Sequence, residues 1–206
     1  ETMRLSYDVQ TFDTVKESTC GSLEELCEQV SEVFLCLPTP MKKTGECDLS
    51  IIENVVSNID NYGKSKIIII KSTIPPGTTE KLNKKCKNIQ IVFNPEFLTE
   101  RSAHFDFINQ ARIILGGTSD NSAGVRLVAD LFRRRFGNTI SILQTNFESA
   151  ELVKYMTNTF FATKVSFLNE MKQLSDSSNA VWDDVVEGFV RDGRVGHSHL
   201  NVPGPD

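Results

Sequence analysis

Two carboxylates, Glu96 and Glu100, lie four residues apart in the nonapeptide Asn94–Ser102, directly after a short apolar run. That run, Ile89–Phe93, is typical of a strand, and Pro95 prevents further pairing of its main chain. In an open parallel sheet the carboxyl ends of the strands line the ligand crevice, so the two acids are placed for chemistry. Taken alone, the nonapeptide fits equally well a solvated loop whose acids cap the next helix.

A second group of polar residues, Glu151, Lys154 and Asn158, is spaced i, i+3, i+7 and shares one face of a helix. A solvated stripe with a Glu–Lys pair worth about 0.3 kcal/mol is the simple interpretation. On a mostly buried helix, however, an ammonium and an amide one turn apart lose hydration and need a partner. A substrate oxyanion would be one such partner.

Two earlier strands stop as abruptly as Ile89–Phe93 does. The run Val33–Leu37 is apolar on both faces, which is typical of a buried parallel strand, and it meets Pro38–Pro40. The run Ile67–Ile70 ends in Lys71–Thr73 before two further prolines. Sequence motifs therefore follow three strand ends.

Strands and helices alternate through this part of the chain, which predicts a parallel sheet covered on both faces. The right-handed crossover rule puts all the strand carboxyl ends at one edge, so Thr39, Thr73 and Glu96 should converge. The other predicted strands are Met3–Val9, Arg112–Leu115 and Ile140–Leu143, and the predicted helices are Ser22–Gln29, Leu49–Asn61, Thr78–Cys86, Asn121–Phe136 and Val181–Val190.

The pattern changes at about Asn146. The stretch Glu148–Leu174 has no Gly or Pro and is apolar nearly all round, so it predicts one long helix buried in a second domain or against another subunit. We therefore predict an α/β domain over residues 1–145 and the start of an all-α, long-helix domain over residues 146–206.

Asp8 lies near the end of the first predicted strand. An acid there can bond the two hydroxyls of an adenosine ribose. A helix or turn cap is the simpler interpretation of Asp8 alone.

Composition excludes several classes of protein. A net charge of −5 over 206 residues, without a basic stripe, argues against nucleic-acid binding. Apolar runs are only strand length, so no membrane span is predicted. Five cysteines without a CxxC pair suit reduced thiols in the cytoplasm, and His197 with His199 lacks a third ligand for a metal.

Together the motifs resemble those of the UDP-glucose/GDP-mannose dehydrogenase family of nucleotide-sugar 6-dehydrogenases, in order and spacing. They are Leu37–Pro40, Lys71–Thr73 with Pro76–Thr79, Asn94–Glu100, Glu151 to Lys154 with Asn158, and Ser166–Glu170. The resemblance implies a Rossmann domain followed by a central helical domain that forms a homodimer through the Glu148–Leu174 helix. It implies oxidation of the C6 alcohol of UDP-glucose to a carboxylate in two hydride transfers to NAD, with a cysteine carrying the intermediate.

The resemblance also assigns roles to residues. Glu96 would be the base of thioester hydrolysis, Thr73 would hold a water, and Lys154 with Asn158 would stabilise an oxyanion. The resemblance implies a cofactor site formed by Asp8, Leu37, Pro38, Thr39, Ser72, Thr73 and Glu100, and a substrate site formed by Glu96, Phe97, Leu98, Glu100, Lys154 and Asn158.

The departures from the family pattern concern both ends of the sequence. No GxGxxG is present, the first Rossmann strand is missing, and Asp13 stands where the family often has a basic residue. Pro203–Asp206 resembles the lead-in to the cysteine nucleophile, which is absent. We therefore expect a fragment that gives no turnover by itself. Loss of the first strand would leave a gap near the middle of a partial Rossmann-like sheet, so we expect either a partner segment that fills the gap or an altered sheet with strong self-association.

Three other interpretations stay open. One is a truncated, inactive nucleotide-binding or dimerisation module. Another is a GDP-mannose or UDP-N-acetylamino-sugar 6-dehydrogenase. The third, a 3-hydroxy acid dehydrogenase, shares the Lys and Asn pattern but not the pair Glu96 and Glu100.

Overall fold

The computed structural model describes residues 2–202, except for the side chain of Glu100. The chain divides into two compact units, residues 1–154 and residues 155–206. Each unit is described by itself.

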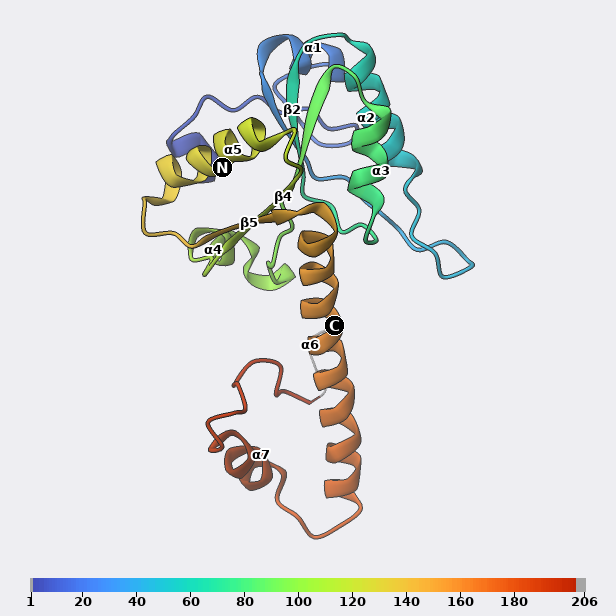
Figure 1. The fold of residues 1–206 in the computed structure, drawn as a ribbon. Coiled ribbons are helices and arrows are strands. Elements are labelled where there is room, and N and C mark those ends of the chain that lie inside the picture. The colour runs from blue at the N-terminus through green and yellow to red at the C-terminus, as the bar shows by residue number, and fades with distance from the viewer. Residues whose placement is uncertain (1, 203–206) are drawn as a thin grey trace. The chain divides into compact units, whose positions relative to one another are not determined.

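The first unit is built on one five-stranded sheet in the order β1-β2-β3-β4-β5 (Figure 1). The strands span Glu32–Leu35 (β1), Lys66–Ile70 (β2), Ile89–Phe93 (β3), Ile113–Gly117 (β4) and Ile142–Asn146 (β5). β1, β2 and β3 are parallel to one another, and β4 is parallel to β5. The predicted α/β class is confirmed.

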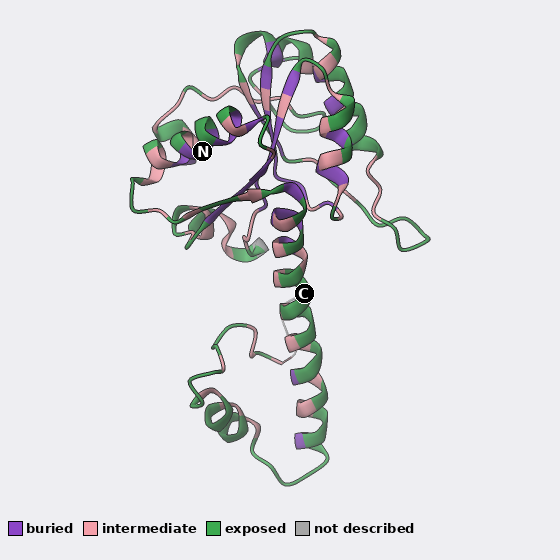
Figure 2. Cartoon of the chain, viewed as in Figure 1, coloured by how far each residue is buried: buried purple, intermediate pink, exposed green. Residues whose placement is uncertain are grey.

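Helices cover both faces of this sheet, as the apolar strand sequences require. On one face, side chains such as Ile68 and Ile70 pack with buried residues of α1 (Leu23–Gln29), α2 (Ser50–Asn61) and α3 (Thr78–Lys85). On the other face, Ile69 and Val92 pack with α5 (Ser122–Phe136). Consecutive residues of one strand thus enter two separate cores, and Figure 2 shows the buried residues concentrated in the sheet.

The sheet is not parallel throughout, which corrects the prediction that all strand ends lie at one edge by parallel crossovers. β4 runs antiparallel to β3 and joins it through one residue pair, Phe93 and Gly116. The connecting chain forms only η2 (Glu100–Ser102) and α4 (Ala103–Ile108), and no residue of α4 is buried, so no covering crossover helix is formed. Because the single pair lies near the carboxyl end of both strands, these two ends still meet.

The predicted strand Met3–Val9 is wrong. Residues Thr2–Leu5 form a 3-10 helix (η1), in which the main-chain nitrogens of Ser6 and Tyr7 both donate to the carbonyl of Met3. Two residues of α5 hold this segment in place. The side chain of Arg135 donates to the Thr2 carbonyl, and the Leu131 carbonyl accepts a hydrogen bond from the Tyr7 hydroxyl. The alternating pattern had no neighbouring strand with which to pair. The five described strands are contiguous, so the sheet is altered, which is one of the two expected alternatives, and no gap is left between them.

The long helix is α6 (Phe147–Asp176), slightly longer than the predicted Glu148–Leu174. Its first part, residues 147–154, belongs to the first unit, where Phe147 and Ala150 join the core. Gly116 permits this close approach, because a Cβ atom there would lie 2.8 Å from the Cβ of Ala150. The beginning of α6 is therefore fixed beside the ends of β3 and β4.

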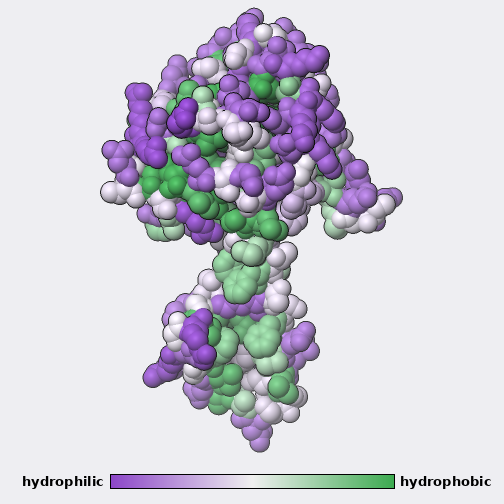
Figure 3. All heavy atoms as spheres, in the orientation of Figure 1, coloured by the Kyte–Doolittle hydropathy of each residue, from purple (hydrophilic) through white to green (hydrophobic). Residues whose placement is uncertain are grey.

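The second unit contains the rest of α6 and α7 (Trp182–Val190). An apolar groove of about 300 Å³ lies between them, lined by Leu168, Met171, Trp182 and Val186 among others. Lys164 of α6 donates to the carbonyls of Gly196 and Ser198. Many apolar side chains of α6 and α7 stay at the surface, as Figure 3 shows. No helix among residues 2–202 is long and apolar enough to cross a membrane.

Candidate functional site

The chain segments that follow β1 and β2 are tied together by side-chain hydroxyls. Ser72 accepts a hydrogen bond from the Leu37 nitrogen at 2.9 Å and donates to the Leu37 carbonyl at 2.8 Å. Thr39 donates to the Thr73 carbonyl at 2.8 Å. The predicted strand Val33–Leu37 ends at Leu35 because Leu37 is bonded to this side chain instead of a strand. Thr39 and Thr73 therefore converge as the sequence predicted.

The segment after β3 joins the same edge through Asn94, which is buried. Its nitrogen donates to the Ile70 carbonyl at 2.9 Å, and its side-chain amide donates to the Ile114 carbonyl at 2.8 Å. The ammonium of Lys71 donates to Asn94 Oδ1 at 3.0 Å. Asn94 thus connects the ends of β2 and β3 to the first half of β4 and fixes the point from which Pro95 and Glu96 leave the sheet.

Glu96 meets the beginning of α6. The Lys154 ammonium donates to the carbonyl oxygen of Glu96 at 2.5 Å, and Lys154 is only 6% exposed. Burial lowers the pKa of Lys154, while the negative charge of Glu96 acts in the opposite direction. The structure therefore brings together two site residues that lie 58 positions apart in the sequence.

Two positive charges lie close to the ring of Phe97. The Arg112 guanidinium is 4.5 Å from the centre of the Phe97 ring, and the Lys154 ammonium is 5.5 Å from it. Such contacts are attractive because the face of an aromatic ring carries negative charge. The ring holds both cations beside Glu96.

Asp106 holds the loop that follows Phe97 in place through hydrogen bonds to Thr99 and Ser102. Its carboxylate accepts hydrogen bonds from the Thr99 nitrogen at 2.9 Å, the Thr99 hydroxyl at 2.6 Å and the Ser102 hydroxyl at 3.0 Å. The Thr99 hydroxyl contributes most to lowering the pKa of Asp106. This arrangement shapes the turn that carries Phe97 and Leu98.

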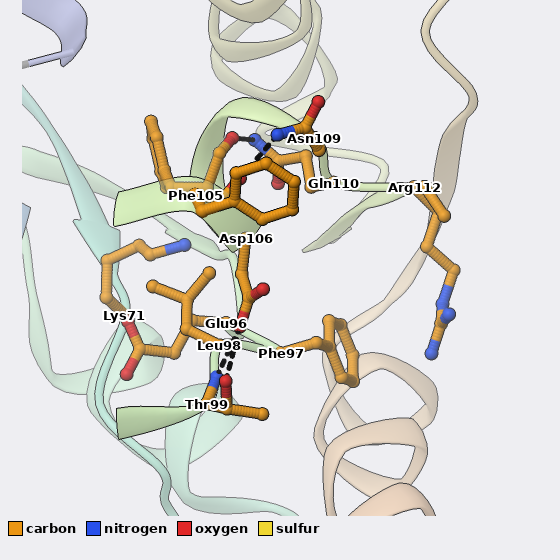
Figure 4. A pocket seen from close by; sticks show the side chains of 12 residues that line it. Lys71, Glu96, Phe97, Leu98, Thr99, Phe105, Asp106, Asn109, Gln110 and Arg112 are labelled. Carbon is orange, nitrogen blue, oxygen red and sulfur yellow. Dashed lines mark hydrogen bonds between the residues drawn. The ribbon is translucent and has the colours of Figure 1, made fainter. Parts of the chain in front are cut away.

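A cavity of about 330 Å³ opens beside this turn, which is large enough for a small organic ligand. Figure 4 shows Lys71, Glu96 and Phe97 at its lower side and the end of α4 above them. The lining residues are Lys71, Glu96, Phe97, Leu98, Thr99, Phe105, Asp106, Phe107, Asn109, Gln110, Ala111 and Arg112.

Not every predicted site residue joins this cluster. Asp8 is exposed and accepts a hydrogen bond from Gln10 at 3.2 Å, and no hydrogen bond among the described residues ties it to the strand ends. Asn158 lies on α6 in the second unit and is exposed. The side chain of Glu100 and residues Pro203–Asp206 lie outside the described part of the chain.

Sequence reasoning missed several residues that shape the site. The sequence placed Glu151 on the same helix face as Lys154 but predicted no partner for it. In the structure its side chain is fully buried and accepts hydrogen bonds from Thr79 at the beginning of α3. Lys71, Asp106 and Arg112 received no role. The one available signal was Lys71 itself, since a lysine directly after a run of four isoleucines must find a buried partner.

Comparison with known proteins matches both parts of the chain. The NAD binding domain of the UDP-glucose/GDP-mannose dehydrogenase family matches residues 12–135, and the central domain of that family matches residues 148–206. UDP-glucose 6-dehydrogenase of Rickettsia typhi is 35% identical over 84% of this chain and 41% of its own length. UDP-glucose 6-dehydrogenase TuaD of Bacillus subtilis is 34% identical over 82% of this chain and 38% of its own length.

Among solved structures, a UDP-glucose dehydrogenase of Pyrobaculum islandicum has a TM-score of 0.78 at 28% identity, covering 88% of this chain and 43% of that one. A 3-hydroxyisobutyrate dehydrogenase of Mycobacterium tuberculosis shares the fold with a TM-score of 0.68 at 14% identity, covering 91% of this chain and 60% of that one. The chain spans less than half the length of the two curated relatives described above.

Proposed function

This chain belongs to the UDP-glucose/GDP-mannose dehydrogenase family, whose first domain binds NAD, and we propose that it supplies part of a nucleotide-sugar 6-dehydrogenase site. The reaction proposed is the oxidation of the C6 alcohol of a nucleotide sugar to a carboxylate. The observation that carries this proposal is the contact between Lys154 and the Glu96 carbonyl. It places a cation and a carboxylate-bearing turn at the edge where three strands end.

The cofactor wall in this proposal is the pair of segments Leu37–Thr39 and Ser72–Thr73. The hydroxyls of Ser72 and Thr39 hold the two segments together, so their main chain is fixed before a ligand binds. Among the described residues the Thr73 hydroxyl forms no hydrogen bond, so it is available to a ligand or a water. Bound NAD would accept hydride there, with Asp8 and Glu100 as further contacts.

Lys154 has the chemistry for stabilising an oxyanion. Its ammonium is fixed by one hydrogen bond, is nearly enclosed and retains further N–H donors. A fixed donor in such a site stabilises developing negative charge far better than water does. Asn158, one turn further along α6, is proposed as the second donor.

Glu96 is proposed as the base for hydrolysis of the covalent intermediate, with a water held by Thr73. The substrate would lie against Glu96, Phe97 and Leu98, whose turn is closed by Asp106. The nucleophile in this family is a cysteine, and none of the five cysteines of this chain lies in the matching motif. We therefore expect no turnover from the 206 residues alone.

UDP-glucose is the substrate that we propose, because the curated relatives described above are named for it. GDP-mannose and UDP-N-acetylamino sugars are the alternatives. The test is NADH formation by the full-length gene product with NAD and each nucleotide sugar in turn. Oxidation of UDP-glucose with two NADH per sugar is expected. Oxidation of none of these sugars, or of 3-hydroxy acids instead, would overturn the proposal.

We also propose that the protein forms a homodimer through the Glu148–Leu174 helix. We propose that it is located in the cytoplasm. Met156 and Phe160 of α6 are 64% and 63% exposed, which is unusual for large apolar side chains on one helix. All five cysteines are free thiols, which suits a reducing compartment.

A further inference from the structure

Lys71 is a buried cation that the proposed reaction does not use. It directly follows β2, is 8% exposed, and its ammonium donates to Asn94 Oδ1 at 3.0 Å. Lysine is rarely buried unless it is paired, because its ammonium loses hydration. The position therefore needs an explanation beyond packing.

The hydrogen-bond partner of Lys71 is Asn94, the first residue of the turn Asn94–Leu98 that contains Glu96 and is called the Glu96 turn below. Both polar atoms of the Asn94 side chain are hydrogen-bonded. Its oxygen accepts from the Lys71 ammonium, and its nitrogen donates to the Ile114 carbonyl at 2.8 Å. Glu96 lies two residues after Asn94, and its main-chain carbonyl accepts a hydrogen bond from the Lys154 ammonium. A change at Lys71 would therefore be transmitted to the turn through Asn94.

Lys71 and Glu96 also line the same cavity (Figure 4). The charged and titratable groups that act on Lys71 come from three surrounding segments: Glu96 after β3, Cys36 after β1, and Lys154 of α6. Burial lowers the pKa of Lys71 to about 8, Glu96 and Cys36 act to raise it, and Lys154 acts to lower it further. Asp106 and Arg112 of the cavity wall are already engaged with Thr99 and Phe97.

We propose that Lys71 is a further positioning residue of this site, whose ammonium orients the Glu96 turn through Asn94 and supplies the positive charge beside the Glu96 carboxylate. The inference rests on the proposed function for its catalytic consequence. Its physical part, the coupling between Lys71 and Glu96, holds without that function. If Lys71 had only a structural role, its size and its hydrogen bond to Asn94 would matter, and its positive charge beside Glu96 would not.

The catalytic test compares pH profiles of kcat/KM for the full-length gene product and its variants, since this ratio reports groups of the free enzyme. Below its pKa Lys71 carries the required charge, so activity should fall as the pH rises through about 8. Lys71→Arg keeps the charge at high pH, so this alkaline fall should move upward by about one pH unit or more. An alkaline fall that stays in place in Lys71→Arg would overturn the proposal.

Lys71→Met removes the charge but keeps the buried stem. We expect kcat to fall about 10- to 100-fold, the factor for one lost hydrogen bond to a charged group. The matched control is Lys66→Met, at the opposite end of β2, where a lysine of equal exposure donates to the Val30 carbonyl. Equal losses in the two variants would show a purely structural effect and overturn the proposal.

A second measurement is independent of turnover. Side-chain NMR of the 206-residue chain should show Lys71 titrating near pH 8, and Glu96→Gln should lower that pKa because a neighbouring negative charge is lost. Glu53→Gln on α2 is the control. An unchanged Lys71 pKa in Glu96→Gln would overturn the coupling. A full-length protein that oxidises no nucleotide sugar would instead contradict the proposed function, and this titration would still decide the coupling.

Discussion

Glu151 and Thr79, which are 72 positions apart in the sequence, form two hydrogen bonds at the beginning of α3. One carboxylate oxygen of Glu151 accepts from the Thr79 nitrogen at 2.8 Å and from the Thr79 hydroxyl at 2.6 Å. The other oxygen accepts from the Gly77 nitrogen at 2.5 Å. Helix α6 is thereby attached to the segment that follows Thr73, so one carboxylate positions both Lys154 and the proposed cofactor wall.

Replacing this carboxylate should destabilise the first unit. In Glu151→Gln the amide nitrogen must face an N–H or O–H donor, which leaves at least one buried donor unpaired. The free energy of unfolding should fall by about 3 kcal/mol. Urea denaturation of the 206-residue chain measures it. Glu148→Gln, an exposed change on the same helix, should stay within about 0.5 kcal/mol of the wild type. Equal effects of the two changes would contradict the assignment.

Lys154→Ala should reduce turnover without unfolding the protein. We expect kcat of the full-length gene product to fall about 100-fold or more, because a fixed donor to an oxyanion is lost. Lys172→Ala on the same helix removes an ion pair with Asp176 and should leave kcat unchanged. Near-normal turnover of Lys154→Ala would remove Lys154 from the chemistry.

Gly116 sets the distance between β4 and α6. In Gly116→Ala the new methyl group would meet Ala150 at 2.8 Å and the Asn146 carbonyl at 3.2 Å, so the strand and helix must separate. We expect a loss of about 2 kcal/mol in the free energy of unfolding. Gly188→Ala on α7 is the control, since its Cβ would enter open space and alanine favours the helix. That variant should be as stable as the wild type or more so.

Asp106 should make the first unit sensitive to acid. Its pKa is lowered in the folded state by the Thr99 hydrogen bonds, so its contribution to stability is present above the unfolded pKa, about 4. That contribution is lost as the pH falls through the lower, folded pKa. Asp106→Asn should melt at a lower temperature at pH 7 and lose less of its melting temperature on acidification. Asp120→Asn, an exposed change, should behave as the wild type does.

The proposed dimer depends on exposed apolar side chains of α6. Phe160→Asp places a charge at a position that is 63% exposed in the single chain, so the fold of the chain should be kept. If this face is buried between two copies, the charge should weaken association strongly. Sedimentation equilibrium should then show a shift from dimer to monomer. Thr163→Asp, an exposed polar position three residues further along, tests for a general effect of charge.

The elements themselves were determined by local sequence. Runs such as Ile67–Ile70 predict a buried strand, and a proline follows each of three predicted strands within a few residues. The long helix was predicted to within two residues at each end, because it has no Gly or Pro. These features depend on the periodicity of burial and on main-chain donors, both of which neighbouring residues decide.

Partners across the fold were decided by the tertiary structure. The pattern of Met3–Val9 suits a strand, but with no strand beside it the segment forms η1 against α5. The antiparallel direction of β4 was decided by its pairing with β3, and Glu151 and Lys71 bond to partners 72 and 23 positions away in the sequence. A buried polar group must bond to whatever donor the fold brings within about 3 Å, and a sequence alone contains no such distances.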